Sequence, residues 1–276
     1  MRLTVRHATA YTHDSPLRFL AQSHRLMPAP NAAQRILEWR VTCEGAVFGE
    51  LFLDGGGDRI NTMTVQGPVE TLEILVDGVV DTTDTAGVLR NHAEIISPRV
   101  YLSPTTPTKM STALGELRQR ALKGAQGSEL DAAHRLSAAV AEAIAWEPGA
   151  THSHTTAAEA LEAGRGVCQD HAHALIALAH ASDLPARYVT GYLLTDAEEG
   201  EAAHAWAEVH IQGLGWVGFD PANRCCPDDR YIRLGSGRNA LEAAPIRGVS
   251  RGGGEEAMAV SVQVTDAAKA QSQSQQ

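Results

Sequence analysis

The sequence contains few cysteines, no long apolar run and no excess of positive charge, and each of these absences excludes a class of protein. The four cysteines include no C-x-x-C pair of the kind that holds zinc, and adjacent Cys225 and Cys226 are poorly placed to bond to each other. Reduced thiols are typical of the cytosol, so the cysteines predict a cytoplasmic protein.

No apolar segment approaches the length that a membrane-spanning helix needs. The first residues alternate as a strand does, instead of forming the apolar block of a signal peptide. The formal net charge of −10 would repel the phosphates of a nucleic acid. We therefore expect neither a membrane nor a nucleic acid among the partners of this chain.

Short alternating segments, separated by turn residues such as Asp-Gly-Gly-Gly-Asp at 54–58 and Gln-Gly-Pro at 66–68, fill the first third of the chain. This pattern predicts an antiparallel β-sandwich over residues 1–97, because proline, serine and threonine accumulate after that point. The expected strands are 3–11, 18–27, 35–43, 50–53, 59–65 and 69–80.

The rest of the chain predicts helices followed by strands. Together with the first third, this order indicates the α+β class, with a core of helices packed on an antiparallel sheet over residues 98–265. Residues 266–276, rich in Ala, Gln and Ser, are expected to form a disordered tail. The expected helices are 111–123, 130–146, a short one from 155 to Gly164, and 172–181, and the expected strands are 186–194, 205–211, 216–219, 230–234 and 257–264, the last preceded by a glycine-rich loop at 250–256.

Cys168 stands between a glycine-paired loop and a helix. Residues 164–170 read GRGVCQD, and the two glycines permit backbone conformations that other residues avoid. Cys168 thus falls at or near the first turn of a buried helix, where unpaired backbone N–H groups and the helix dipole favour a thiolate. A small cysteine packed beneath a helix would fit the same position, so residues further along the chain must decide between the two interpretations.

A histidine and an aspartate lie at matching ends of a predicted hairpin. His204 opens one strand, Asp220 follows its partner strand, and the midpoint between them is Gln212, beside the predicted turn. A cysteine nucleophile needs a base to take its proton and a third group to orient that base. Cys168, His204 and Asp220 therefore form a candidate catalytic triad.

Contact between His204 and Asp220 requires that both side chains lie on one face of the hairpin. On two antiparallel strands, the residue numbers of any two residues that face each other add up to the same total. For His204 to face Asp220, that total must be 424. A turn at 212–215 would instead give a sum of 427 and point the two side chains to opposite faces. We therefore predict a tighter turn centred near 212–213, or a β-bulge between Trp206 and Phe219.

These segments resemble the bacterial transglutaminase-like family of papain-like thiol enzymes. The similarity is carried by GRGVCQDHAHALIALAH, PARYVTGYL and HAWAEVHIQGLGWVGFDPANR, and the opening HATAYTHDSP and the late YIRLGSGRN fit a branch with an N-terminal β-sandwich domain. The resemblance implies a roughly papain-like core and thiol-dependent acyl transfer on amides. It implies that Cys168 is the nucleophile, His204 the general base and acid, and Asp220 the residue that orients the imidazole.

Three further residues are candidates for supporting roles. Asp170 matches an acid that the family often has two places after the nucleophile. One oxyanion donor is expected to be the backbone N–H of Cys168, and the Gln169 side chain or the Trp146 indole could supply a second. The apolar bulk of Trp146 favours the plainer interpretation, which is packing at the end of a helix.

A histidine cluster offers a competing interpretation, since His152, His154, His171 and His173 flank Cys168 and a transition metal could be held there. However, His171 and His173 are two residues apart on a helix and point to different faces, and no second cysteine is near in the sequence. No Asp-x-Asp-x-Asp loop for calcium is present either. We therefore expect no metal and no cofactor.

The sequence thus predicts a thiol enzyme that attacks the amide carbonyl of a peptide or protein substrate through Cys168. Water is always present, and no amine-binding site can be recognised in the sequence. Both points favour hydrolysis, as in a protease or an amidase. Transfer to an amine, as in a transglutaminase, is the alternative outcome of the same chemistry. From a different class, the alternative is a peptide-binding module that keeps the fold without turnover.

Overall fold

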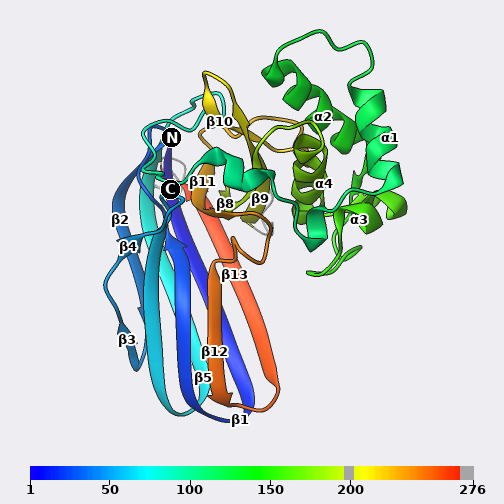
Figure 1. The fold of residues 1–276 in the computed structure, drawn as a ribbon. Helices are drawn as coiled ribbons and strands as arrows, with labels where there is room; N and C mark the ends of the chain where they lie inside the picture. The colour runs from blue at the N-terminus through cyan, green and yellow to red at the C-terminus, as the bar shows by residue number, and fades with distance from the viewer. Residues whose placement is uncertain (196–201, 268–276) are drawn as a thin grey trace, which may run out of the picture.

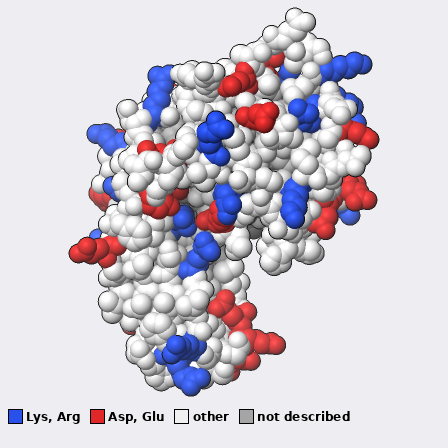
Figure 2. All heavy atoms as spheres, in the orientation of Figure 1, with Lys and Arg blue, Asp and Glu red and all other residues white. Residues whose placement is uncertain are grey.

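The computed structural model describes residues 1–195 and 202–267 of the chain. Long antiparallel strands form one part of the molecule, and four α-helices packed on a second, four-stranded sheet form the other (Figure 1). The α+β class is therefore confirmed. Among the described residues, no helix is both long and apolar enough to cross a membrane. On the face that Figure 2 shows, acidic and basic side chains are interspersed over both parts.

Two very long strands, β1 (Arg2–Met27) and β5 (Arg59–Thr82), build the first sheet. The sequence predicted two separate strands in each of these stretches. Instead β1 and β5 pair with each other on both sides of a bend, where shifts of register at 12–17 and 17–19 interrupt the ladder (Figure 1). Tyr11 and Ile74 from one arm share a core with Leu20 and Met63 from the other, so the sheet folds over itself into the two layers of a sandwich.

The remaining strands of this sheet come from both ends of the chain. The strands β2 (Gln34–Cys43), β3 (Ala46–Phe48) and β4 (Phe52–Leu53) pair with β5. The strands β12 (Ile246–Gly252) and β13 (Glu256–Asp266) pair with β1.

Assigning every late strand to the catalytic core was therefore wrong for β12 and β13. The expected loop at 250–256 is also partly strand, since β12 runs to Gly252. Glycine and arginine give this segment little intrinsic strand preference, but the unpaired edge of β1 supplies backbone partners for it. Of the tail expected to be disordered, residues 268–276 lie outside the described residues.

The helical part follows two short 3₁₀ turns, η1 (Pro98–Leu102) and η2 (Thr106–Thr108). Its helices are α1 (Thr112–Ala121), α2 (Glu129–Ala143), α3 (Ala157–Ala163) and α4 (Cys168–His180). Side chains of Ser111, Ser128 and Thr156 cap the first three, as their sequences suggest. The helix expected over 130–146 ends at Ala143, because Ala145–Trp146 forms the short strand β6, which pairs with β7 (Arg165–Gly166).

The sheet beneath the helices has the order β10-β9-β8-β11. Its strands are β8 (Ala186–Leu193), β9 (Ala203–Ile211), β10 (Gly215–Phe219) and β11 (Tyr231–Gly237). The alanine, leucine and isoleucine side chains of α4 are fully buried against β8 and β9, so α4 is the central helix of this core.

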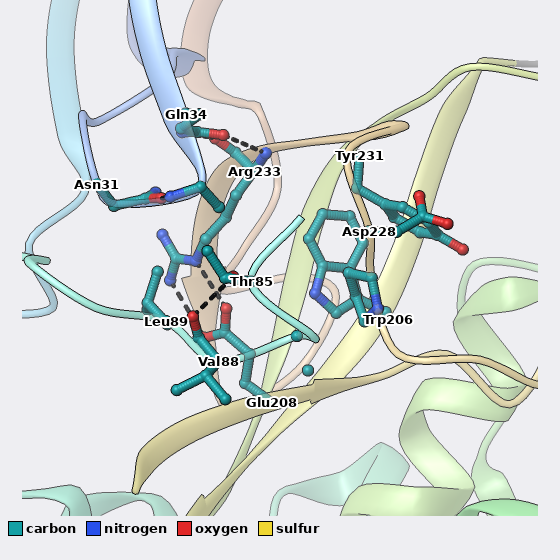
Figure 3. Close-up of a pocket in the computed structure, with 14 residues that line it drawn as sticks. Asn31, Gln34, Thr85, Val88, Leu89, Trp206, Glu208, Asp228, Tyr231 and Arg233 are labelled. Atoms are coloured by element: carbon teal, nitrogen blue, oxygen red, sulfur yellow. Dashed lines mark hydrogen bonds and ion pairs between the residues drawn. The ribbon is translucent and has the colours of Figure 1, made fainter. Parts of the chain in front are cut away.

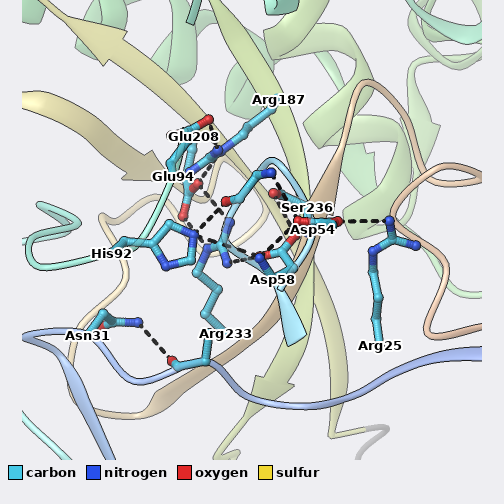
Figure 4. Close-up of polar contacts among 12 residues, drawn as sticks. Arg25, Asn31, Asp54, Asp58, His92, Glu94, Arg187, Glu208, Arg233 and Ser236 are labelled. Atoms are coloured by element: carbon cyan, nitrogen blue, oxygen red, sulfur yellow. Dashed lines mark hydrogen bonds and ion pairs between the residues drawn. The ribbon is translucent and has the colours of Figure 1, made fainter. Parts of the chain in front are cut away.

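A buried ionic cluster joins the two parts of the molecule (Figure 4). Arg233 of β11 donates to Asp58 Oδ1 at 2.6 Å and to Glu208 Oε1 at 2.9 Å. Arg187 of β8 donates to Glu208 Oε2 at 2.6 Å and to Glu94 Oε1 at 3.0 Å. Because Asp58 comes from the sandwich while Glu208 comes from β9, neither part satisfies these charges alone.

Buried histidines predict an acid-labile fold. Burial lowers the pKa of each of four imidazoles from 6.5 to about 4, so the unfolded chain binds more protons than the folded one between these values, and stability should fall as the pH drops through that window. The four are His7, His24, His92 and His173.

We expect the urea midpoint to fall steeply between pH 6.5 and pH 4. Replacing buried His24 with Gln should reduce the slope of stability against pH by the amount that corresponds to one proton taken up on unfolding. The same change at exposed His152 should leave the slope unchanged. A urea midpoint that stays constant down to pH 4 would contradict the prediction.

Candidate active site

Cys168 is the first residue of α4, and the β6–β7 ladder fixes the loop before it. The backbone N–H of Ala145 donates to the carbonyl of Gly164 at 2.9 Å, and that of Glu147 donates to Gly166 at 2.9 Å. Glycine is required at 166, because a Cβ there would lie 2.7 Å from Asp170 Oδ2. The Cys168 thiol is partly buried at the helix N-terminus, as the sequence predicted.

Asp170 is fully buried and shapes this loop. Its Oδ2 accepts hydrogen bonds from the backbone N–H of Val167 at 2.8 Å and from the Thr151 hydroxyl at 2.6 Å. The carboxylate therefore satisfies an orphan donor at the start of α4 and ties the helix to the preceding loop. In this position Asp170 supports the conformation that presents Cys168.

The two candidates for a second oxyanion donor are Gln169, next to Cys168 on α4, and Trp146, on the strand that pairs with the loop before α4. The Gln169 amide donates to the Ser153 carbonyl at 3.3 Å, which ties it to the loop before α3. Trp146 lies on β6 directly beside Gly166, and its side chain is 60% exposed. Within the part of the chain that the structure describes, its indole N–H has no hydrogen-bond partner, so this donor is free for a substrate group.

His204 and Asp220 lie in contact, with 2.6 Å between Nε2 and Oδ2. The β9–β10 ladder is regular and pairs Ile211 with Gly215, which gives a number sum of 426. This total differs from 424 by two, an even number. Because side chains alternate along a strand, the side chains of His204 and Asp220 therefore lie on the same face of the hairpin. The predicted bulge is absent from the ladder; the turn instead closes one residue tighter, over 212–214, with Gly213 and Gly215 at positive φ.

The surroundings of His204 favour its protonated form. Burial by itself lowers the pKa of the imidazole, but the hydrogen bonds and charges of Asp220 and Cys168 outweigh burial and raise the pKa from 6.5 to about 10. The pKa of Asp220 is lowered although burial opposes this, because His204 and two further donors stabilise the carboxylate. With Nε2 on Asp220, the other ring nitrogen, Nδ1, is left for Cys168.

The two further donors to Asp220 are Asn223 and Tyr231, and sequence reasoning missed both. Asn223 follows three residues after the aspartate in the run DPAN, a spacing at which an aspartate commonly accepts from the backbone N–H, and this signal was available. Tyr231 gave no local signal, because β11 reaches the site only by pairing with β8. The rings of Trp206 and Tyr231 also lie 6.4 and 5.9 Å from the His204 ring.

The histidines of the competing metal interpretation make other contacts. His171 hydrogen-bonds through its two ring nitrogens to the carbonyls of Val167 and Ile144, each at 2.9 Å. His173 Nε2 accepts from the backbone N–H of Ala240 at 3.1 Å. In residues 1–195 and 202–267, no group of three or more His, Cys, Asp or Glu side chains has the arrangement of a metal site.

A small pocket lies beside Trp206 and Tyr231, the two aromatic residues whose rings are near His204 (Figure 3). Trp206 and Tyr231 line it together with Thr85, Val88 and Leu89, which lie in the segment between β5 and η1. Its volume of about 50 Å³ has room for only a few water molecules. This pocket is therefore too small for a peptide, and Cys168 is not among the residues that line it.

Comparison with known families agrees with this geometry. The profile of the transglutaminase-like superfamily matches residues 116–221, which contain all three candidate triad positions. The profile of the bacterial transglutaminase-like N-terminal region matches residues 3–81. An uncharacterized protein of Mycobacterium tuberculosis is 30% identical over 273 residues, which cover 90% of this chain and 87% of the relative. The chain belongs to the transglutaminase-like superfamily.

Two further proteins, one compared by sequence and one by structure, match this chain over almost its whole length. An uncharacterized protein of Mycobacterium leprae is 29% identical over 285 residues and covers 96% of this chain and 98% of its own length. A crystal structure described as a candidate cysteine protease from Cytophaga hutchinsonii superposes with a TM-score of 0.73 at 21% identity, covering 96% of this chain and 90% of that one. This chain therefore shares the fold of that structure over almost its whole length.

Proposed function

We propose that this protein cleaves amide bonds of a peptide or protein substrate through a Cys168–His204–Asp220 triad. The observation that carries the proposal is the position of His204, whose Nε2 lies 2.6 Å from Asp220 while Cys168 faces the rest of the ring. A protonated imidazole beside a cysteine favours the thiolate, which is the nucleophilic form. The Cytophaga neighbour, described as a candidate cysteine protease, supports this type of chemistry.

In the first step, the Cys168 thiolate attacks the amide carbonyl carbon and forms a C–S bond. The oxyanion that develops is stabilised by the backbone N–H of Cys168 at the start of α4, with the exposed Trp146 indole or the Gln169 amide as the second donor. The C–N bond then breaks, and His204 Nδ1–H gives its proton to the leaving nitrogen. A thioester and a neutral imidazole remain.

In the second step, a water molecule attacks the thioester while His204 Nδ1 takes its proton. The C–S bond breaks, the acid is released, and the thiolate–imidazolium pair is restored. An amine could replace water and give transglutaminase chemistry. Hydrolysis is the proposed outcome, because water is always present at a partly exposed thiol. The cytosol is the proposed location, where unpaired cysteines stay reduced.

A peptide-binding module without turnover is the competing function. It would be favoured by a buried thiol and by a His204 ring turned away from its partners. In this structure the thiol is partly exposed, and the ring contacts Asp220 and faces Cys168. These contacts argue for turnover.

We expect iodoacetamide at pH 6 to label Cys168 well before the other three thiols. Burial raises the pKa of Cys43, of Cys225 and, to about 11, of Cys226, so these three should react only in alkaline solution. Mass mapping of labelled peptides from pH 5 to pH 9 measures this order. Labelling of Cys168 that rises only above pH 8, in step with the other cysteines, would overturn the proposal.

Hydrolysis and amine transfer can be separated with one peptide library. Incubation in H₂¹⁸O should place ¹⁸O in the new carboxyl groups of cleaved peptides, and Cys168→Ser should abolish this signal. Addition of a fluorescent primary amine such as dansylcadaverine tests the alternative. Incorporation of the amine without cleavage would assign transglutaminase activity instead.

A further inference from the structure

One oxygen of the Asp220 carboxylate accepts three hydrogen bonds. Its Oδ2 receives His204 Nε2 at 2.6 Å, Asn223 Nδ2 at 2.7 Å and the Tyr231 hydroxyl at 2.8 Å. The other oxygen, Oδ1, receives the backbone N–H of Asn223 at 3.2 Å. Four donors thus converge on a carboxylate that is completely buried, and only one of them belongs to the proposed triad.

The loop after Asp220 is built to hold these donors in place. Asp220 and Cys225 exchange two backbone hydrogen bonds, at 2.8 and 3.2 Å, which close residues 221–224 into a small loop. Arg224 adopts a left-handed conformation at φ 56°, which is strained for an arginine, and its guanidinium fastens the loop to the Ala141 carbonyl of α2. Tyr231 approaches from the start of β11, and its hydroxyl also lies 3.3 Å from Cys225 Sγ.

We propose that Tyr231 and Asn223 are positioning residues that aim the Asp220 carboxylate and share its charge, and so limit how tightly His204 holds its proton. This inference rests on the proposed function, because the proton on His204 must pass to the leaving nitrogen. A buried carboxylate with the imidazolium as its sole partner would attract that ion strongly and make the imidazolium a poorer acid. Two neutral donors on the same oxygen weaken this attraction without removing the charge.

The charged and titratable groups around the pair are few. His204 faces Asp220, from the loop after β10, and Cys168 from α4, while the rings of Trp206 and Tyr231 lie against its ring. Asn223 Nδ2 also lies 3.2 Å from His204 Nε2, so Asn223 touches both members of the pair. Asp220 faces His204 and Tyr231, and Cys225 lies behind the Tyr231 hydroxyl. The effect of a change at Tyr231 or Asn223 should therefore appear most directly as a change in the pKa of His204.

The first experiment follows His204 by NMR titration in a Cys168→Ala background, which removes the coupled thiol. We expect Tyr231→Phe and Asn223→Ala each to raise the pKa of His204 by about half a unit to one unit, which is part of the full effect of one hydrogen bond to a charged group because the lost bond is to Asp220 and not to His204 itself. Cys225→Ala is the matched control, because it removes the other contact of the Tyr231 hydroxyl and leaves its bond to Asp220 intact. Its His204 titration should be unchanged.

The second experiment compares turnover with alkylation. Tyr231→Phe should lower kcat on a cleaved peptide about tenfold with little change in KM, while iodoacetamide labelling of Cys168 at pH 6 stays within about twofold of the original rate. A purely structural role would lower both rates together. Asn223 is exposed, so Asn223→Ala tests the same point in a variant whose fold is not at risk.

The positioning role fails if the His204 titration is unmoved in both Tyr231→Phe and Asn223→Ala, or if Cys225→Ala moves it as much as they do. Failure of the proposed function has a different signature. The unmodified protein would then show no amide cleavage, and Cys168 would be labelled only in alkaline solution. The NMR result in the Cys168→Ala background decides the positioning role in either case.

Discussion

His204→Ala should lower amide turnover by about 10⁴-fold or more and should also suppress the labelling of Cys168 at pH 6. The change removes the group that we propose gives a proton to the leaving nitrogen, and it removes the positive charge that would favour the thiolate. His210→Ala on the same strand is the control, since its ring packs on Trp216 and not on the nucleophile. Loss of equal size in both variants would show that β9 was damaged rather than a base removed.

Asp220→Asn should cost much less, about ten- to a hundredfold in turnover. An amide oxygen at the same place can still accept from His204 Nε2 and hold the ring, although it stabilises the imidazolium less than a carboxylate does. Circular dichroism should first establish that both variants are folded. If Asp220→Asn then costs as much as His204→Ala, Asp220 does more than orient the imidazole.

Glu208→Gln should destabilise the protein by about 3–5 kcal/mol, because it leaves two buried arginines without their shared charge. Glu208 is 3% exposed, and its carboxylate lies between Arg187 and Arg233, which are themselves almost wholly buried. Burial alone would raise the pKa of Glu208, but Arg233 and Arg187 lower it to about 2. Urea unfolding at pH 7 measures the loss.

Glu242→Gln is the matched control for this prediction. It removes the same charge from a pair with Arg238 whose side chains are 32% and 41% exposed, and it should cost less than about 1 kcal/mol. The contribution of Glu208 should be present above pH 4.5 and be lost as the pH falls from 4.5 toward 2, since its folded pKa is depressed. If Glu208→Gln costs no more than the small loss expected for Glu242→Gln, the buried cluster contributes little to stability.

The same cluster ties the sandwich to the helical core. Arg233 of the core sheet depends on Asp58, which lies in the glycine-rich turn of the sandwich, and Asp58 also accepts from the backbone N–H of Ser236 at 2.6 Å. Glu208, on the other side of Arg233, is four residues along β9 from His204. The sandwich therefore completes the buried polar contacts of the strand that carries the proposed base.

The sequence by itself determined the features that depend on short-range patterns. Cap residues and helical spacing located the four helices, GRGVCQD placed Cys168 at a helix start, and turn glycines placed His204 and Asp220 at one end of a hairpin. These signals survive because capping, helix propensity and tight turns act within a few residues of the chain.

Only the tertiary structure decided what depends on contacts between distant segments. It paired β12 and β13 with β1, kept β1 and β5 continuous through their bends, and brought Tyr231 and Asp58 to their partners. No local pattern encodes which strand will pair with an open sheet edge, or which acid will meet a buried arginine. Those choices follow from long-range packing and from the cost of leaving a buried backbone group or charge unpaired.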